Sequence, residues 1–233
     1  MTMPNKAGIQ CMCGIIHREV ERMDYEIKRL SPDLAEDYFD FFDNRAFSDG
    51  SPFYPCYCNA FNMSKDRIKT EINQKAEAYG GGQEGWKRAL RESAERMVAS
   101  GEIQGYLANV QGISVGWCNA NERMNYYRTG EFNLDHVPED EICTHCSGPG
   151  EIKAIVCFEI APEYRGKGIA TALLKRVCDD AKAEGYQYVE AYPVKDGGDL
   201  GKAFTGPVHL YEKAGFAVFA QINNTYVMRK QLI

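Results

Sequence analysis

Two cations and two glycines alternate at one turn of the chain, in the order Arg165-Gly166-Lys167-Gly168. The run before it, Ala154 to Ile160, is apolar and rich in β-branched residues, which predicts a buried strand. Pro162 ends that strand, because proline cannot donate to a ladder. After the turn, apolar residues recur at every fourth position and predict one face of a helix: Ile169, Leu173, Val177 and Ala181.

A glycine-rich turn at the start of a helix favours anion binding. The first backbone N–H groups of a helix have no partner inside it, and the helix dipole adds about half a positive charge there. Glycines leave these donors open to a bulky anion, and Arg165 and Lys167 add formal charge. The spacing therefore indicates a phosphate or pyrophosphate site. The alternative is an ordinary strand-to-helix turn with two solvated cations.

The composition restricts the classes of partner. The chain has 233 residues, of which 44% are hydrophobic and 26% charged, as is typical of a soluble globular protein. No apolar run approaches the ~18 residues that span a bilayer, and the N-terminus lacks the features of a secretory signal. Nine cysteines, an odd number, favour reduced thiols and a cytoplasmic location. A net charge of -6 disfavours nucleic acid and mildly favours a cationic partner such as an amine.

The remaining elements follow from periodicity and turn residues. Helices are expected from Ser31-Pro32 onward, from Ser64 to Tyr79, and over a segment that points Trp86, Leu90, Ala94 and Met97 inward. A short helix opens at Pro207 and is capped by Gly215. Further strands are expected over Tyr25–Leu30, Ile103–Val110, Ile113–Cys118, Gln187–Tyr192, Phe216–Ala220 and Thr225–Arg229.

Two stretches have no clear period. The aromatic segment 47–63 either lines a pocket or plugs the edge of the core. Segment 119–150 is long for a loop in a compact domain. It holds Cys143-x-x-Cys146 near His136 and His145, and the N-terminus holds Cys11-x-Cys13 near His17. Zinc sites need more complete ligand sets, so packed or free cysteines are favoured and no metal is expected.

Two motifs resemble one protein family. The run from Ile160 to Ala170, with Arg165-Gly166-Lys167-Gly168-Ile169-Ala170 at its centre, resembles the acetyl-CoA signature Arg/Gln-x-x-Gly-x-Gly/Ala of the GCN5-related N-acetyltransferases (GNAT). Downstream, the run from His209 to Phe216 is similar to the family's closing Leu-Tyr-x-x-x-Gly-Phe helix and turn. Two matches in the family's order are more specific than either alone.

The resemblance implies an α+β, three-layer fold. Its central sheet would be mixed but mostly antiparallel, with six to seven strands flanked by helices, and splayed between the fourth strand (Ala154 to Ile160) and the fifth (Gln187 to Tyr192). We expect an N-terminal extension over 1–22 and one acetyltransferase domain over 23–233, with inserted helices and loops at about 47–100 and 119–150. A homodimer is compatible with the family, whose sheet edges often pair.

The family's use of acetyl-CoA as a co-substrate carries over residue by residue. The pantetheine would occupy the gap and pair with backbone groups of Ile160, while the Phe158 N–H would point at the thioester carbonyl and stabilise a developing oxyanion. Arg165 would begin the pyrophosphate turn. The backbone amides of that turn would hold the pyrophosphate: Gly166, Lys167, Gly168, Ile169 and Ala170.

The acid and the base have different support. Tyr211 occupies the family's usual position for the acid that protonates the leaving thiolate, and the alternative is a packed aromatic residue. Strand alternation places Ala154, Val156 and Phe158 on one face, where some relatives carry Glu or His. None stands there in this chain. Glu190 on the fifth strand is the first candidate for the base; the others are Glu159, expected to face away, His136, His209 or a water chain.

The sequence thus predicts direct acetyl transfer from acetyl-CoA to a primary amine of a small molecule. The alternative is a catalytically weak acyl-CoA-binding or regulatory module on the same fold. The missing base favours the module, and Tyr211 favours the enzyme.

Overall fold

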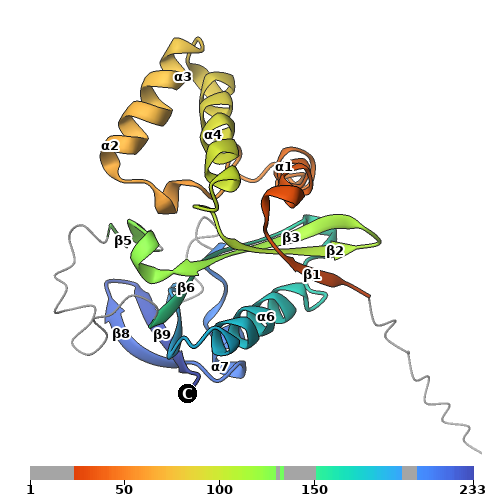
Figure 1. Cartoon of the computed structure of the whole chain (residues 1–233), viewed down its shortest axis with the longest axis vertical. Coiled ribbons are helices and arrows are strands. Elements are labelled where there is room, and N and C mark those ends of the chain that lie inside the picture. The colour runs from red at the N-terminus through yellow and green to blue at the C-terminus, as the bar shows by residue number, and fades with distance from the viewer. Residues whose placement is uncertain (1–23, 130–131, 134–150, 196–203) are drawn as a thin grey trace, which may run out of the picture.

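One sheet organises the protein (Figure 1). The computed structural model describes residues 24–129, 132–133, 151–195 and 204–233. Within these ranges, seven strands form a sheet in the order β1-β2-β3-β6-β7-β9-β8. Every neighbouring pair is antiparallel except β6 with β7, which is parallel. The expected mixed, mostly antiparallel sheet flanked by helices is confirmed.

The bounds of the elements are as follows. The strands of the sheet are β1 (Glu26–Arg29), β2 (Gly105–Val110), β3 (Ile113–Glu122), β6 (Ile152–Ile160), β7 (Tyr188–Ala191), β8 (Ala217–Ile222) and β9 (Thr225–Gln231), and a separate short pair is β4 (Arg128–Thr129) with β5 (Phe132–Asn133). The helices are α1 (Ala35–Asn44), α2 (Lys65–Arg67), a π-helical segment (Ile68–Asn73), α3 (Gln74–Ala78), α4 (Gly82–Ala99), α6 (Ile169–Ala183) and α7 (Val208–Lys213).

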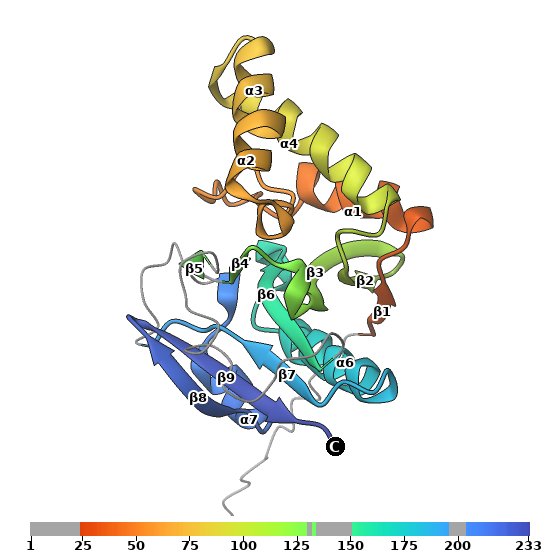
Figure 2. The same ribbon diagram turned by 60° about the vertical axis from the view of Figure 1, so that its left-hand side comes forward.

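Helices cover the two faces of the sheet differently. Figures 1 and 2 show α1 and the arm formed by α2, α3 and α4 on one side, and α6 and α7 on the other. On the α1 face, the ring of Tyr38 packs edge-on against buried Trp117 at 4.9 Å. On the α6 face, Gly116 leaves room for Ile169, because a Cβ there would lie 3.0 Å from that side chain. Strands β3 and β6 therefore lie in the middle of the core.

A slip in the pairing of β3 with β6 changes which face each residue occupies. Asn119 pairs with Cys157, but the next residue of β3, Ala120, pairs with Ile155, so β6 carries one extra residue. Phe158 lies opposite Cys118, whereas Ala154 lies opposite Asn121. Since residues 118 and 121 of one strand face opposite sides, so do Phe158 and Ala154. The prediction that Ala154, Val156 and Phe158 share one face is therefore wrong.

Strands β6 and β7 pair over only part of their length. Their parallel register runs from Ile152–Tyr188 to Ile155–Ala191 and stops there, while β6 continues to Ile160. The predicted divergence of these two strands is present. Beyond Ile155, β3 is the one described strand that pairs with β6.

A side-chain cap sets the start of the helical arm. Ser64 caps the arm, because its side chain accepts a hydrogen bond from the Arg67 N–H.

The expectation that Trp86 points inward is wrong, since its side chain is 37% exposed. The neighbouring Gly85 lies against α3, where a Cβ would be 2.5 Å from the Ala76 carbonyl oxygen. That close backbone contact rotates the buried face of α4 away from Trp86.

Several predictions concern residues outside the described ranges. These are the extension over 1–22 with Cys11, Cys13 and His17, the cluster of His136, Cys143, His145 and Cys146, and the loop that begins at Asp196. Among the helices of the described residues, none combines the length and apolar character needed to cross a membrane.

Replacing Asn119 by Ala should destabilise the protein by about 2 to 4 kcal/mol, measured by chemical denaturation. Asn119 is fully buried; its Nδ2 donates to the Cys58 carbonyl (3.0 Å), and its Oδ1 accepts from the Tyr126 hydroxyl (2.6 Å). The substitution leaves both partners buried without this bond. Asn44→Ala, at an exposed asparagine, is the control and should change stability by less than about 0.5 kcal/mol. Equal effects of the two changes would contradict this account of Asn119.

Candidate active site

A cavity of about 580 Å³ opens beside the end of β6. It brings together four residues that the sequence assigns to acetyl-CoA, namely Phe158, Ile160, Arg165 and Ala170. The rest of its wall comes from the segment after α1, from β6 and from the residues leading into α7: Asp49, Gly50, Ser51, Pro52, Phe53, Glu159, Phe204, Gly206, Pro207 and Leu210. Residues far apart in the sequence thus meet at the place where β6 leaves β7.

The glycine-rich turn presents a row of backbone donors at the start of α6. Gly166 and Gly168 have positive φ angles of 74° and 84°, and a Cβ at either would meet nothing within 4 Å. No hydrogen bond to a described residue uses the N–H groups from Gly166 to Ala170. Unpaired N–H groups at a helix N-terminus attract anions. Lys167 lies over the ring of Tyr164, with its Nζ 5.0 Å from the ring centroid.

The backbone of β6 adds further donors that face the gap. The Ala161 N–H donates to the Val115 carbonyl at 2.9 Å. In an antiparallel ladder, residues that bond to the neighbouring strand alternate with residues whose polar groups point the other way. Phe158 and Ile160 are of the second kind, so their N–H and C=O groups point away from β3 and into the space that β7 has left.

Arg165 joins the turn to the cavity wall. Its Nη1 lies 2.6 Å from Asp49 Oδ2, its Nη2 lies 3.5 Å from Glu159 Oε1, and its Nε donates to the Ile160 carbonyl at 3.0 Å. The side chain therefore lies along the cavity wall, with 46% of it still exposed to solvent. The hydrogen bond from Arg165 holds the pKa of Asp49 below its usual value.

Glu159 is the carboxyl group of this cavity whose pKa is raised. Burial raises the pKa of Glu159 to about 7, against an opposing effect of Arg165. The side chain lines the cavity and is 12% exposed, although it lies on the opposite face of β6 from Phe158, as strand alternation predicts. A carboxyl group that titrates near neutral pH can accept a proton under physiological conditions.

Tyr211 lies directly below the cavity wall. Its ring is fully buried and its hydroxyl donates to the Thr205 carbonyl at 2.5 Å. A Cβ on Gly206 would be 3.1 Å from the same hydroxyl and 3.4 Å from the Phe158 ring, so these groups are neighbours. Burial raises the pKa of Tyr211 well above its ordinary value. The phenol is therefore protonated at neutral pH and able to donate.

Glu190 lies in a different environment from Glu159. It is fully buried on β7, and its carboxylate accepts from Arg229 Nε (2.5 Å) and from the Tyr192 hydroxyl. Arg123 Nε lies 3.4 Å from the same carboxylate. Both oxygens are thus engaged in a charged network. His209, another candidate for the base, is on the exposed side of α7, and His136 lies outside the described residues.

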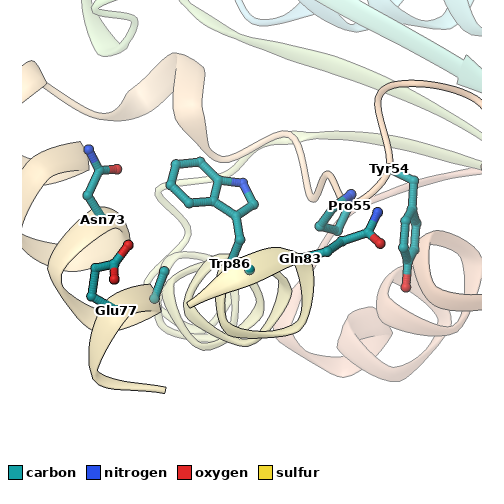
Figure 3. A pocket seen from close by; sticks show the side chains of 8 residues that line it. Tyr54, Pro55, Asn73, Glu77, Gln83 and Trp86 are labelled. Atoms are coloured by element: carbon teal, nitrogen blue, oxygen red, sulfur yellow. The ribbon is translucent and has the colours of Figure 1, made fainter. Parts of the chain in front are cut away.

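The aromatic segment 47–63 contributes to two hollows. Phe53 packs edge-on against Phe204 at 5.4 Å, which closes one side of the cavity. The next residues, Tyr54 and Pro55, border a second, open hollow of about 540 Å³ against α3 and α4. Figure 3 shows Trp86 and Glu77 in its wall. Sequence reasoning missed this hollow because it treated Trp86 as a core residue.

The described residues offer no metal centre. Within 24–129, 132–133, 151–195 and 204–233, no group of three or more His, Cys, Asp or Glu side chains is arranged to hold a metal ion. What the cavity offers is one carboxyl group with a raised pKa, one buried phenol and a line of open backbone donors.

The raised pKa of Glu159 predicts a specific dependence of stability on pH. The folded-state pKa of about 7 exceeds the ordinary value of 4.5, so the folded state binds more protons between these values. Glu159 then stabilises the fold fully below pH ~4.5, and this contribution is lost as the pH rises through ~7. Glu159→Gln should therefore be as stable as the parent at pH 5 and more stable by about 2 to 3 kcal/mol at pH 8.5, measured by urea denaturation. Parallel stability curves for the two proteins would contradict this.

Comparison with known proteins identifies a family to which the chain is similar. The profile of the Acetyltransferase (GNAT) family matches residues 74–216. No curated protein matches the chain.

Solved structures that are similar to this chain include several acetyltransferases. An acetyltransferase of the GNAT family from Streptococcus pneumoniae is 16% identical, with 90% of this chain and 100% of that chain covered and a TM-score of 0.45. The PaiA N-acetyltransferase from Thermoplasma acidophilum, in complex with coenzyme A, is 17% identical, with coverages of 90% and 99% and a TM-score of 0.47. The putative acetyltransferase YncA from Salmonella typhimurium, with acetyl-CoA, is 12% identical, with coverages of 90% and 94% and a TM-score of 0.46.

The profile covers more than half of the chain and includes both sequence motifs, β6 with its glycine-rich turn and α7 with Tyr211. The chain belongs to the acetyltransferase (GNAT) family.

Proposed function

We propose that the protein transfers the acetyl group of acetyl-CoA directly to a primary amine of a small molecule. One observation carries the proposal. The gap-facing backbone groups of Phe158 and Ile160 continue into the unpaired N–H groups from Gly166 to Ala170. An extended chain that ends in a diphosphate, as in coenzyme A, complements such a line: amide groups along the strand and phosphate oxygens at the helix N-terminus.

The roles of the cofactor-binding residues follow from this placement. The N–H groups of Gly166, Lys167, Gly168, Ile169 and Ala170 would hold the diphosphate, and the open space above the two glycines fits a bulky anion. Ile160 would pair with an amide of the pantetheine, once Arg165 releases its carbonyl. The Phe158 N–H would donate to the thioester carbonyl, where negative charge develops during attack.

We propose Glu159, and not Glu190, as the general base. Glu159 lines the cavity and has a pKa of about 7, whereas both oxygens of Glu190 are engaged by arginines and Tyr192. An alkylammonium must lose a proton before it can attack, and a carboxylate within reach can take it, directly or through water. When Glu159 is ionised, Asp49 and Glu159 together exceed the charge of Arg165 by one negative charge, which favours a cationic acceptor.

Tyr211 would donate a hydrogen bond to the sulfur that leaves, in place of its bond to the Thr205 carbonyl. Its raised pKa keeps the phenol protonated, and its hydroxyl lies near Phe158 and Gly206 in the cavity wall. A hydrogen bond stabilises the developing thiolate, and the proton removed from the amine finally converts the thiolate to the thiol. In the products, the acetyl group forms an amide and coenzyme A leaves with a free thiol.

A second candidate function is a module that binds acyl-CoA without efficient catalysis. The observation that favours it concerns Arg165, which contacts Asp49 and donates to the Ile160 carbonyl. The pantetheine would need that same carbonyl.

Release of free thiol from acetyl-CoA separates the two functions. The purified chain is incubated with acetyl-CoA and a panel of primary amines, and thiol is measured with a chromogenic disulfide. We expect amine-dependent release, with kcat/KM rising with pH through an apparent pKa near 7 and falling at least ~100-fold in Glu159→Gln. Tight binding of coenzyme A without amine-dependent release would establish the binding module, and an unchanged rate in Glu159→Gln would refute its role as the base.

Replacing Tyr211 by Phe tests the proposed donor. We expect kcat to fall by about 100-fold, because the leaving sulfur loses a hydrogen bond, while the affinity for coenzyme A measured by calorimetry changes less than about threefold. Tyr226→Phe, at a partly buried tyrosine of β9 outside the cavity wall, is the matched control and should leave both quantities unchanged. A Tyr211→Phe enzyme with parental kcat would show that Tyr211 is only a packed aromatic residue.

A further inference from the structure

Three thiols form a line on the α1 face of the sheet. Cys56 and Cys58 belong to the segment between α1 and α2, and Cys157 lies on β6. The Cys58 N–H donates to Cys56 Sγ at 3.3 Å, which places the Cys56 thiol beside Cys58. The Tyr38 hydroxyl donates to the carbonyl of Tyr57, the residue between them, and so ties this segment to α1.

The fold holds Cys58 against Cys157. The Cys58 carbonyl accepts from Asn119 Nδ2, and Asn119 is the direct cross-strand partner of Cys157. Directly opposed residues of an antiparallel pair have neighbouring side chains on the same face. Cys58 also has a positive φ of 51°, which is costly for a residue with a Cβ. The surroundings therefore fix an unfavourable backbone conformation that holds Cys58 beside Cys157.

Exposure differs along this line of thiols. Cys56 is partly exposed, whereas Cys58 and Cys157 are only 2% and 5% exposed. Hydrogen bonding and burial raise the pKa of both Cys56 and Cys58, so the thiols are protonated and slow to react at neutral pH. The partly exposed Cys56 is the sulfur that a small oxidant reaches first.

We propose that Cys56, Cys58 and Cys157 form a thiol-oxidation site that takes a hydroperoxide and ends as a Cys58–Cys157 disulfide. The peroxide transfers one oxygen to the Cys56 sulfur, which becomes a sulfenic acid, and water (or an alcohol) is released. The Cys58 sulfur attacks it, forming the Cys56–Cys58 disulfide and a water molecule. The Cys157 sulfur then attacks the Cys58 sulfur, and its proton passes to Cys56, which leaves as a thiol. In total, two thiols lose two hydrogens, and the peroxide is reduced.

The disulfide has a consequence that rests on the proposed function. Glu159 lies two residues after Cys157, and Gly50 to Phe53, which line the same cavity, precede Cys56. A covalent link between Cys58 and β6 would fix this segment beside the proposed base. We expect oxidation to reduce acetyl transfer and a dithiol reductant to restore it.

Mass spectrometry of the full chain tests the site independently of activity. The reduced protein is treated with hydrogen peroxide at pH 8.5, free thiols are trapped with an alkylating agent, and the digest is searched for linked peptides. We expect a peptide pair that joins Cys58 to Cys157 and disappears on reduction. The link should be absent in Cys58→Ser and Cys157→Ser. It should form at least ~10-fold more slowly in Cys56→Ser, and at the parental rate in Cys118→Ser, whose thiol is fully buried elsewhere in the core.

Each result decides between the proposal and its rejection. Recovery of Cys58 and Cys157 as alkylated thiols, or a link from either to a different cysteine, would overturn the site. A parental rate in Cys56→Ser would overturn the relay through Cys56. If the Cys58–Cys157 link forms but the reduced protein releases no thiol from acetyl-CoA with any amine, the oxidation site stands and the proposed acetyl transfer fails.

Discussion

The site depends on the backbone pairing between β6 and β7, and on the point where that pairing ends. Its parallel pairing with β7 ends at Ile155 and Ala191, while its antiparallel pairing with β3 continues to Ile160. Backbone N–H and C=O groups in a protein interior need partners, and those of Phe158 and Ile160 have none from β7. A ligand with amide groups can supply them. At this gap the sheet lacks a neighbouring strand for the end of β6. The glycine-rich turn beyond it extends the same line of backbone donors.

Arg165 connects that line of donors to the chemistry of the cavity. Its guanidinium contacts Asp49 and Glu159 and its Nε holds the Ile160 carbonyl. A diphosphate bound at the turn would compete for the same positive charge. Any loosening of the contact between Arg165 and Glu159 would leave burial as the dominant influence on that carboxyl group, and would raise its pKa further. Binding of the donor substrate at the turn would therefore be electrostatically coupled to the proposed basicity of Glu159.

Local sequence signals predicted the parts of the fold that depend on local physics. The β-branched run before Pro162, the fourfold period after Gly168 and the two motifs around Arg165 and Tyr211 led to the family, its sheet and the place of the turn. The proposed base, Glu159, could not be singled out in this way, because alternation places it on the opposite face of β6 from Phe158. The extra residue in β6 reverses the alternation between Phe158 and Ala154, and no residue type in the strand marks that slip.

Contacts between residues far apart in the sequence could not be predicted from periodicity either. The pKa of Glu159 reflects burial by segments far away in the chain, and Glu190 is engaged by Arg229 and Arg123 from other elements. The exposure of Trp86 follows from the close approach of Gly85 to the Ala76 carbonyl, which depends on how α3 and α4 meet. The contact of Cys58 with Cys157 requires Asn119 to bridge the segment before α2 and the sheet.

The central claim is that the backbone from Phe158 to Ala170 binds coenzyme A. Amide hydrogen exchange, followed by mass spectrometry with and without saturating coenzyme A, measures those N–H groups directly. The account predicts slower exchange in peptides that cover 158–160 and 166–170, and little change in peptides from the far end of the helical arm at 74–86. Unchanged exchange at the strand end and the turn, with binding confirmed by calorimetry, would contradict it.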